Sequence, residues 1–368
     1  MVEWKKLGDV CEVLRGKRLT KSQLDDKEGY PVLHGGSSPM GYYKEFNRKA
    51  NTTVVVNTGN AGSVFFYDKE FWSSDACYAL YPNDSLIDKF LYLYVYGCER
   101  LLKGRIRAGA MPTIDADAIK SLVIPVPSIA EQSRIVGILD TFTASIENLK
   151  QQIEQRRKQY EHYRDQLLDL EGKEGVEMKR LEEIVASNCS LSYGIVQPGD
   201  DVINGIPVVR PVDLITTYVK LDGLKRTTIQ ISNSYKRTIL EGNEILFCVR
   251  GTTGIMGLAT NELKGCNVTR GIVPISFDDE TTKKFVYYQL KSYRLQKTIE
   301  EKTNGTALRQ INIKDLRLLN LRMPSLPEQQ RIVSILDTFE DSIANLEQQL
   351  AQRERQYEYY RNKLLTFE

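Results

Sequence analysis

The chain has 368 residues, of which 41% are hydrophobic and 27% are charged, and its formal net charge is +2. This length suits two or three domains of about 100–200 residues each, and no apolar run approaches the roughly 18 residues that a membrane helix needs. The first residues lack the apolar core of a secretion signal, and the six cysteines form no CxxC pair, so we expect a cytoplasmic protein with reduced thiols, no structural zinc and no membrane association.

The first block, residues 1–126, reads as a mixed α/β domain. Runs of β-branched and aromatic residues broken by Gly or Asn predict strands within 30–36 and 52–67, and a helical stretch follows at 89–104. Glycine next to polar residues lets the backbone approach a ligand closely, and such polar side chains contact DNA phosphates and base edges. The DNA-contacting residues predicted on this basis are Arg15, Lys17, Arg18, His34, Ser37, Tyr42, Tyr43, Asn57, Thr58, Asn60, Arg105 and Arg107.

The second block, residues 127–171, predicts one long helix. Ser128 and Glu131 have the spacing of a capping box, in which a hydroxyl and a carboxylate bond the first free amides. Apolar residues then follow at alternating steps of four and three, a 3.5-residue period typical of a coiled coil. About 42 helical residues would form a rod of roughly 60 Å. The predicted seam residues are Ile135, Leu139, Phe142, Ile146, Leu149, Ile153 and Tyr160.

The third block, residues 172–323, reads as a second mixed α/β domain. Strands are predicted within 206–214 and 244–260, and a helical stretch at 283–301. Its predicted DNA-contacting residues, chosen by the same criteria, are Ser192, Tyr193, Gln197, Arg210, Arg250, Thr252, Thr253, Arg270, Asn304, Thr306, Arg309 and Gln310. For every cluster in both blocks, an ordinary turn is the alternative interpretation.

The fourth block, residues 324–368, repeats the second. The two segments align without gaps, and 28 of 45 positions are identical. Ser325 and Glu328 repeat the capping-box spacing, with Pro327 in the first turn. The predicted seam residues are Ile332, Leu336, Phe339, Ile343, Leu346, Leu350 and Tyr357.

Each seam has one polar interruption, at Arg156 and at the equivalent Arg353. These arginines either set the register and reach outward to solvent, or contact another subunit. The obvious partner for each helix is the other copy, although the period alone does not distinguish parallel from antiparallel packing.

The chain is therefore two half-molecules in tandem. The α/β blocks carry an excess of basic residues, with 17 Lys/Arg against 15 Asp/Glu in 1–126 and 22 against 17 in 172–323. The helical blocks are acidic, with 6 against 8 and 5 against 8. This alternation favours a polyanion as the partner of the α/β blocks, although so mild a bias also occurs on solvated surfaces.

Motifs for catalysis are missing from the sequence. It contains neither GxxxxGK[ST] nor GxGxxG for nucleotides, and no Asn/Asp-Pro-Pro-Tyr/Phe signature of an adenine methyltransferase. Capping explains Glu131 and Glu328, which could otherwise be taken for catalytic acids. We therefore predict no catalytic residues, no metal and no cofactor in this chain.

The sequence resembles the specificity-subunit family of type I restriction-modification systems over essentially its whole length. The resemblance rests on a duplicated entry motif that follows each α/β block: Ile124-Pro125-Val126-Pro127, Glu131-Gln132, Arg134-Ile135 and Leu139-Asp140, and again Met323-Pro324, Glu328-Gln329, Arg331-Ile332 and Leu336-Asp337.

The resemblance implies two target-recognition domains separated by two long antiparallel coiled-coil helices in a pseudo-two-fold repeat. Each domain would read one half of a bipartite site in double-stranded DNA. The helices would set the spacer and dock two methyltransferase subunits, which bind S-adenosylmethionine and methylate adenine, and restriction/translocase subunits would join them. A rod of roughly 60 Å exceeds the DNA turn of about 34 Å, which agrees with separated half-sites.

Two other functions remain open at this point. A structural coiled-coil scaffold without base-specific reading would explain the seam, but not the duplicated motif around two divergent basic blocks. A self-sufficient DNA-modifying enzyme is disfavoured by the missing motifs.

Overall fold

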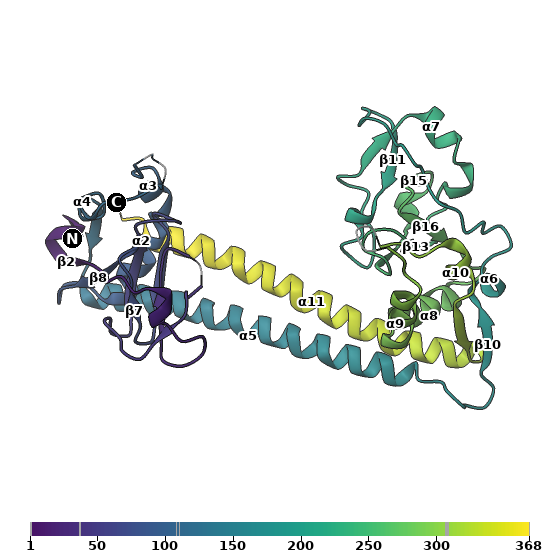
Figure 1. Cartoon of the computed structure of the whole chain (residues 1–368), viewed down its shortest axis with the longest axis horizontal. Helices are drawn as coiled ribbons and strands as arrows, with labels where there is room; N and C mark the ends of the chain where they lie inside the picture. The colour runs from purple at the N-terminus through teal and green to yellow at the C-terminus, as the bar shows by residue number, and fades with distance from the viewer. Residues whose placement is uncertain (1, 37, 108, 110, 306–308, 368) are drawn as a thin grey trace. The chain divides into compact units, whose positions relative to one another are not determined.

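The computed structural model describes residues 2–36, 38–107, 109, 111–305 and 309–367. The chain divides into two compact units, unit 1 with Met1–Gln151 and Glu347–Glu368, and unit 2 with Gln152–Leu346. The long helices α5 (Ile129–Leu167) and α11 (Leu326–Leu365) each contribute residues to both units (Figure 1). Among the described residues, no helix is long and apolar enough to cross a membrane.

Unit 1 is built on an antiparallel four-stranded sheet in the order β2–β8–β5–β6. The inner strand β5 pairs with β8 and β6 at its two edges. It is buried at every residue, because Val55 packs in one apolar cluster and Val54 and Val56 pack in another. A smaller sheet has the order β4–β3–β7, and β1 pairs with β9. The strand bounds are β1 Glu3–Lys6, β2 Cys11–Arg15, β3 Tyr30–Leu33, β4 Tyr42–Tyr43, β5 Thr52–Val56, β6 Val64–Tyr67, β7 Trp72–Ser73, β8 Cys77–Pro82 and β9 Val123–Val126.

The helices of unit 1 complete its main core. Phe90, Leu91 and Leu93 of α2 are buried in the same apolar cluster as Leu80 of the sheet. The helix predicted at 89–104 is in fact two, because Cys98 (φ −90°, ψ 4°) leaves helical geometry between them. The bounds are α1 Leu7–Val10, α2 Asp88–Gly97, α3 Glu99–Lys103 and α4 Ala116–Lys120, with a 3-10 turn, η1, at Lys21–Gln23.

Unit 2 contains two three-stranded sheets, β14–β13–β16 and β12–β11–β15, and the pair β10–β17. The run predicted as strand over 206–214 ends at Val209, and the 3-10 turn η2 (Pro211–Asp213) follows it. The strand bounds are β10 Glu177–Arg180, β11 Ile206–Val209, β12 Lys225–Thr227, β13 Ile245–Cys248, β14 Met256–Leu258, β15 Asn267–Val268, β16 Ile272–Ile275 and β17 Asn320–Met323.

The predicted helix 283–301 of unit 2 also divides into two. Ser292 has extended geometry (φ −64°, ψ 149°), and its hydroxyl accepts a hydrogen bond from the Leu295 amide, so it caps a new helix. The bounds are α6 Leu181–Ile184, α7 Ile229–Asn233, α8 Glu280–Lys291, α9 Tyr293–Glu301 and α10 Ile313–Arg317, with 3-10 turns η2 Pro211–Asp213, η3 Lys236–Thr238 and η4 Asn261–Leu263.

The long helices contact each other within each unit. In unit 1, Phe142 stacks on Tyr360 with ring centroids 5.3 Å apart, and the Arg353 guanidinium lies over the Phe142 ring at 5.6 Å. In unit 2, Arg156 lies over Phe339 at 5.8 Å. Both arginines that interrupt the seams therefore cover the equivalent phenylalanine of the other helix, a cation–π contact.

The start of each long helix differs from the predicted capping box. The Ser128 hydroxyl does accept from the Glu131 amide at 3.3 Å, but the Glu131 carboxylate pairs with Arg134 at 2.7 and 2.8 Å. These hydrogen bonds lower the pKa of Glu131. Glu328 pairs with Arg331 in the same way. The carboxylates thus prefer a guanidinium one turn away over the backbone amide.

Gln132 joins the start of α5 to the α/β domain of unit 1. Its side chain is fully buried, its amide nitrogen donates to Ser85 O (2.8 Å) and Pro127 O (2.9 Å), and its oxygen accepts from the Ile87 amide (2.8 Å). Gln329 donates to Pro324 O in unit 2 at 2.9 Å. The glutamine of the entry motif therefore connects helix and domain.

Gln132→Ala should lower the free energy of unfolding by about 1–3 kcal/mol, because it leaves three backbone groups, one buried and two partly buried, without their side-chain partner. Urea unfolding of the chain measures this. The exposed Gln348 of α11 provides the control, and its alanine variant should stay within about 0.5 kcal/mol of the wild type. Equal effects of the two substitutions would contradict the role given to Gln132.

Candidate nucleic-acid interface

Residues 73–76 lie at the centre of the predicted DNA-contacting residues of unit 1. The Lys17 amide donates to Ser73 O at 2.9 Å. Nδ1 of His34 lies 2.8 Å from the Ser74 hydroxyl. The segment therefore holds together two loops that are separated in the sequence.

The turn between β5 and β6 joins the same segment. The Asn57 amide donates to Ala76 O at 2.8 Å, and its side chain donates to Asp75 O at 3.2 Å. Nε of Arg15 donates to the same Asp75 oxygen at 2.9 Å. Three predicted clusters, from β2, β3 and β5, thus meet at one place in unit 1.

A fourth cluster reaches this group through Thr113. Thr58 and Arg107 both form a β-bridge with Thr113, and the Ile114 amide donates to Asn57 O at 2.9 Å. The Arg107 guanidinium pairs with Asp115. We call residues 15–18, 34–36, 57–60, 73–76, 107 and 113 loop cluster 1.

Arg105 is a predicted residue whose side chain is used elsewhere. Its guanidinium donates to Ala118 O at 2.7 Å and to the Ser121 hydroxyl at 3.1 Å, at the end of α4. The arginine therefore satisfies helix-terminal groups, which is a structural role.

Gly16 is needed for the loops of unit 1 to come together. A Cβ at this position would clash with the backbone oxygens of Ser73 and Ser74. The backbone just after β2 can therefore approach the Ser73 and Ser74 carbonyls this closely only because Gly16 has no side chain.

Unit 2 repeats the arrangement. The Ile195 amide donates to Val268 O, and the Val249 amide donates to Gly271 O, both at 2.8 Å. A Cβ on Gly194 would clash with Val268 and Thr269 oxygens, as on Gly16 in unit 1. We call residues 193–197, 249–255, 268–271, 304 and 309–311 loop cluster 2.

The bridges around Gln310 match those around Thr113. Gln310 forms β-bridges with Arg250 and Asn304, and the Ile311 amide donates to Val249 O at 3.0 Å. The Gln310 side chain also donates to the Tyr193 hydroxyl at 3.4 Å. Predicted residues from four separate segments of unit 2 are therefore neighbours.

Each unit has a turn, after β5 or after β13, that contains two glycines at the same spacing. Gly59 and Gly62 have φ of 87° and 81°, and Gly251 and Gly254 have φ of 84° and 90°. In each turn the second glycine amide donates back to the preceding strand, to Val56 O at 2.8 Å or to Cys248 O at 2.9 Å. Positive φ favours glycine at all four positions.

Several predicted arginines have their charge compensated within the chain. Arg210 makes a bidentate pair with Asp213 at 3.0 and 2.8 Å, and these hydrogen bonds raise the pKa of Arg210. Arg309 pairs with Glu300 at 3.1 Å. An internally paired guanidinium is less available to DNA than a free one, because the pair must separate first.

Other predicted residues lie at the margins of the clusters. Tyr43 packs edge-on against Trp72 at 4.9 Å, and Trp72 donates to Lys17 O at 2.8 Å, which ties β4 to loop cluster 1. The Ser192 hydroxyl donates to Ser190 O, and Gln197 is exposed. Ser37 and Thr306 lie outside the described residues. Tyr42 is half-buried in β4. The remaining predicted residues are half-buried or exposed in the loops: Arg18, Asn60, Thr252, Thr253 and Arg270.

The prediction from sequence missed the segments that connect each cluster. Ser73, Ser74 and Asp75 in unit 1, and Thr113, were not singled out. The only signal was a short polar run between two aromatic strands, which looks like an ordinary turn.

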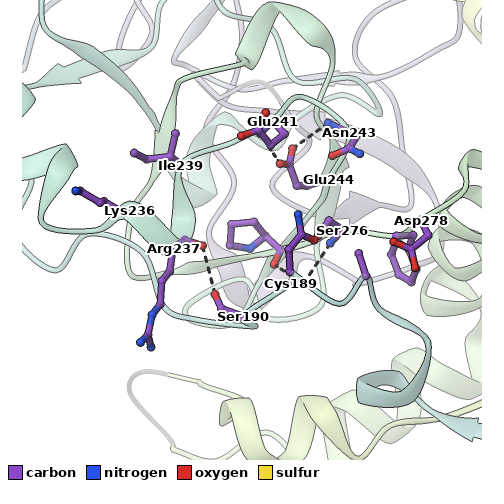
Figure 2. A pocket seen from close by; sticks show the side chains of 14 residues that line it. Cys189, Ser190, Lys236, Arg237, Ile239, Glu241, Asn243, Glu244, Ser276 and Asp278 are labelled. Carbon is purple, nitrogen blue, oxygen red and sulfur yellow. Dashed lines mark hydrogen bonds between the residues drawn. The ribbon is translucent and has the colours of Figure 1, made fainter.

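A pocket of about 420 Å³ in unit 2 is a separate feature (Figure 2). None of the predicted DNA-contacting residues lines it. The Glu244 carboxylate points into a turn of its own chain, where it accepts from the amides of Glu241, Gly242 and Asn243 at 2.6–3.0 Å. These bonds give Glu244 a structural role.

Comparison with known proteins gives the family of this chain. Residues 1–155 and 173–355 match the family described as type I restriction modification DNA specificity domain. The chain belongs to this family. The specificity subunit of the type I restriction enzyme EcoR124I/EcoR124II of Escherichia coli is 30% identical, over 100% of this chain and 94% of that protein. The EcoBI specificity subunit of the same organism is 24% identical, over 89% and 77%.

Solved structures of type I systems share the fold. An S subunit from M. genitalium aligns with a TM-score of 0.66 at 18% identity, covering 100% of this chain and 97% of that one. A chain from a study of complex assembly and conformational transition of the type I R-M system aligns with a TM-score of 0.62, also at 18% identity, covering 99% and 97%. This specificity-family chain is therefore a mixed α/β protein with long helices, as expected.

Gly16→Ala and Gly194→Ala should each destabilise the chain by about 2 kcal/mol or more, because the new methyl group overlaps backbone that cannot move aside. The matched control is Gly137→Ala, where a Cβ in the middle of α5 meets nothing within 4 Å. That variant should be neutral or more stable by about 0.5–1 kcal/mol. Denaturant unfolding of the three variants is the measurement, and a tolerated Gly16→Ala would argue against the close approach.

Proposed function

We propose that this chain reads a bipartite, asymmetric sequence in double-stranded DNA, with one half read by residues 1–126 and the other by residues 172–323. The observation that carries the proposal is that each unit gathers most of its predicted DNA-contacting residues into one loop cluster. Equivalent backbone positions carry different side chains, such as Thr58 and Arg250, or Arg107 and Asn304. Two similar scaffolds with different side chains would read different half-sites.

The two helical blocks, 127–171 and 324–368, serve in this proposal as an antiparallel coiled coil that sets the length of the unread spacer. The fourteen predicted seam residues support this, because every one is buried or half-buried. The direction of the helix contacts in unit 1 also supports antiparallel packing. Phe142 of α5 stacks on Tyr360 of α11, and Lys150, further along α5, pairs with Glu354, which comes earlier in α11. The acidic helical blocks suit protein partners better than DNA.

In this proposal, methylation and cleavage are carried out by partner subunits. Two methyltransferase subunits would dock on the helices, bind S-adenosylmethionine and methylate adenine, and restriction/translocase subunits would join for cleavage. This chain would supply target recognition and no catalytic group. A scaffold that does not read bases is the competing function, and membership of a DNA specificity family counts against it.

Methylation mapping tests the proposal. The chain is co-expressed with the methyltransferase of its own system, and adenine methylation is mapped by single-molecule sequencing. We expect one bipartite, asymmetric motif to be methylated. Cells with the methyltransferase alone are the control and should lack it. If the assembled complex gave the same methylation as the methyltransferase alone, the chain would not read DNA, and the scaffold function would remain.

A further inference from the structure

Two arginines of loop cluster 2 lie at the end of the same strand pairing. Strands β13 and β16 are antiparallel, with Cys248 opposite Ile272 at the end of the pairing. The hydrogen bond from the Val249 amide to Gly271 O, 2.8 Å, continues the same register by one residue. Arg250 and Arg270 flank this bond. Arg250 lies on the segment that bridges Gln310, and Arg270 lies in the turn closed by the hydrogen bond from the Ile272 amide to Thr269 O at 2.9 Å.

The backbone of both arginines is anchored while their side chains are not. Arg250 is in a β-bridge with Gln310, and the Arg270 amide donates to Ile195 O at 2.7 Å. Over the described ranges, neither guanidinium forms an ion pair with a carboxylate. The nearby Asp213 is already paired with Arg210.

Two neighbouring arginines without a carboxylate partner leave their guanidinium donors available to the acceptors of a ligand. Arg270 is exposed and Arg250 is half-buried, so both can be reached from solvent.

Unit 1 has different chemistry at the same register positions. Strands β5 and β8 end with Val56 opposite Cys77, and the Asn57 amide donates to Ala76 O at 2.8 Å. Thr58 and Asp75 flank this bond, as Arg250 and Arg270 flank theirs. A hydroxyl and a carboxylate cannot make the contact that two guanidinium groups can.

In DNA, a guanidinium makes its most common specific contact with the O6 and N7 acceptors of guanine. We propose that Arg250 and Arg270 are specificity-determining residues that read guanine in the half-site of unit 2, which rests on the proposed function of the chain as a DNA reader. The unit 1 half-site, read by a cluster with Thr58 and Asp75 at these positions, lacks this requirement.

The test maps adenine methylation by the assembled complex with Arg250→Gln, Arg270→Gln and Arg250→Lys. Each glutamine variant should lose roughly 5- to 150-fold of the preference for guanine at one position of one half-site. The other half-site should keep its preference. Arg250→Lys keeps the charge but not the bidentate geometry, so it should methylate well and lose the same preference.

Thr58→Ala, at the equivalent position of unit 1, is the matched control, and it should leave the guanine preference of the unit 2 half-site unchanged. Thermal unfolding of each complex confirms assembly, and Arg250→Lys carries the test if a glutamine variant fails to assemble. Uniformly weaker methylation in Arg250→Gln with wild-type preference in Arg250→Lys would mean a phosphate contact and overturn the proposal.

A wild-type motif whose two half-sites both lack guanine would also overturn it, while the reading function stands. Failure of the reading function itself looks different, because the wild-type complex would then give no bipartite motif at all.

Discussion

Each loop cluster depends on one close approach between two backbone segments. Gly16 passes against the carbonyls of Ser73 and Ser74, and Gly194 passes in the same way against Val268 and Thr269. Since no side chain fits there, one hydrogen bond can join segments that are more than 50 residues apart. Without this contact the predicted residues would sit on separate loops. With it, they share a backbone frame that is the same in both units.

A shared frame with different side chains separates positioning from specificity. The hydrogen bonds that build the clusters come mainly from the backbone, so the side chains at equivalent positions can vary without loss of the fold. Some side chains in the clusters are used internally, as Arg210 is by Asp213. Others, such as Arg250, have no carboxylate partner within the described part of the chain, and these remain for the ligand.

The joint between domain and helix differs between the units in its polar contacts. In unit 2, Asp337 bonds Lys284 and Tyr288, both at 2.6 Å, and Glu340 bonds Lys291 at 2.9 Å. Burial and the nearby Glu340 raise the pKa of Tyr288. In unit 1 the position equivalent to Glu340 is Thr143, whose hydroxyl bonds its own helix at 3.0 Å. The similar entry motifs thus lead into unequal joints.

The sequence by itself determined the order of the blocks, the length of both helices and the family, because apolar period and duplication are local patterns that survive without tertiary contacts. It also indicated most of the cluster residues, since glycine beside polar side chains marks a turn. Tertiary structure alone decided where the helices at Cys98 and Ser292 break and that Glu131 bonds Arg134. It also decided that Thr58 and Asp75 match Arg250 and Arg270. These outcomes depend on strand register and on competition among hydrogen-bond partners, and neither is encoded in the spacing of residues along the chain.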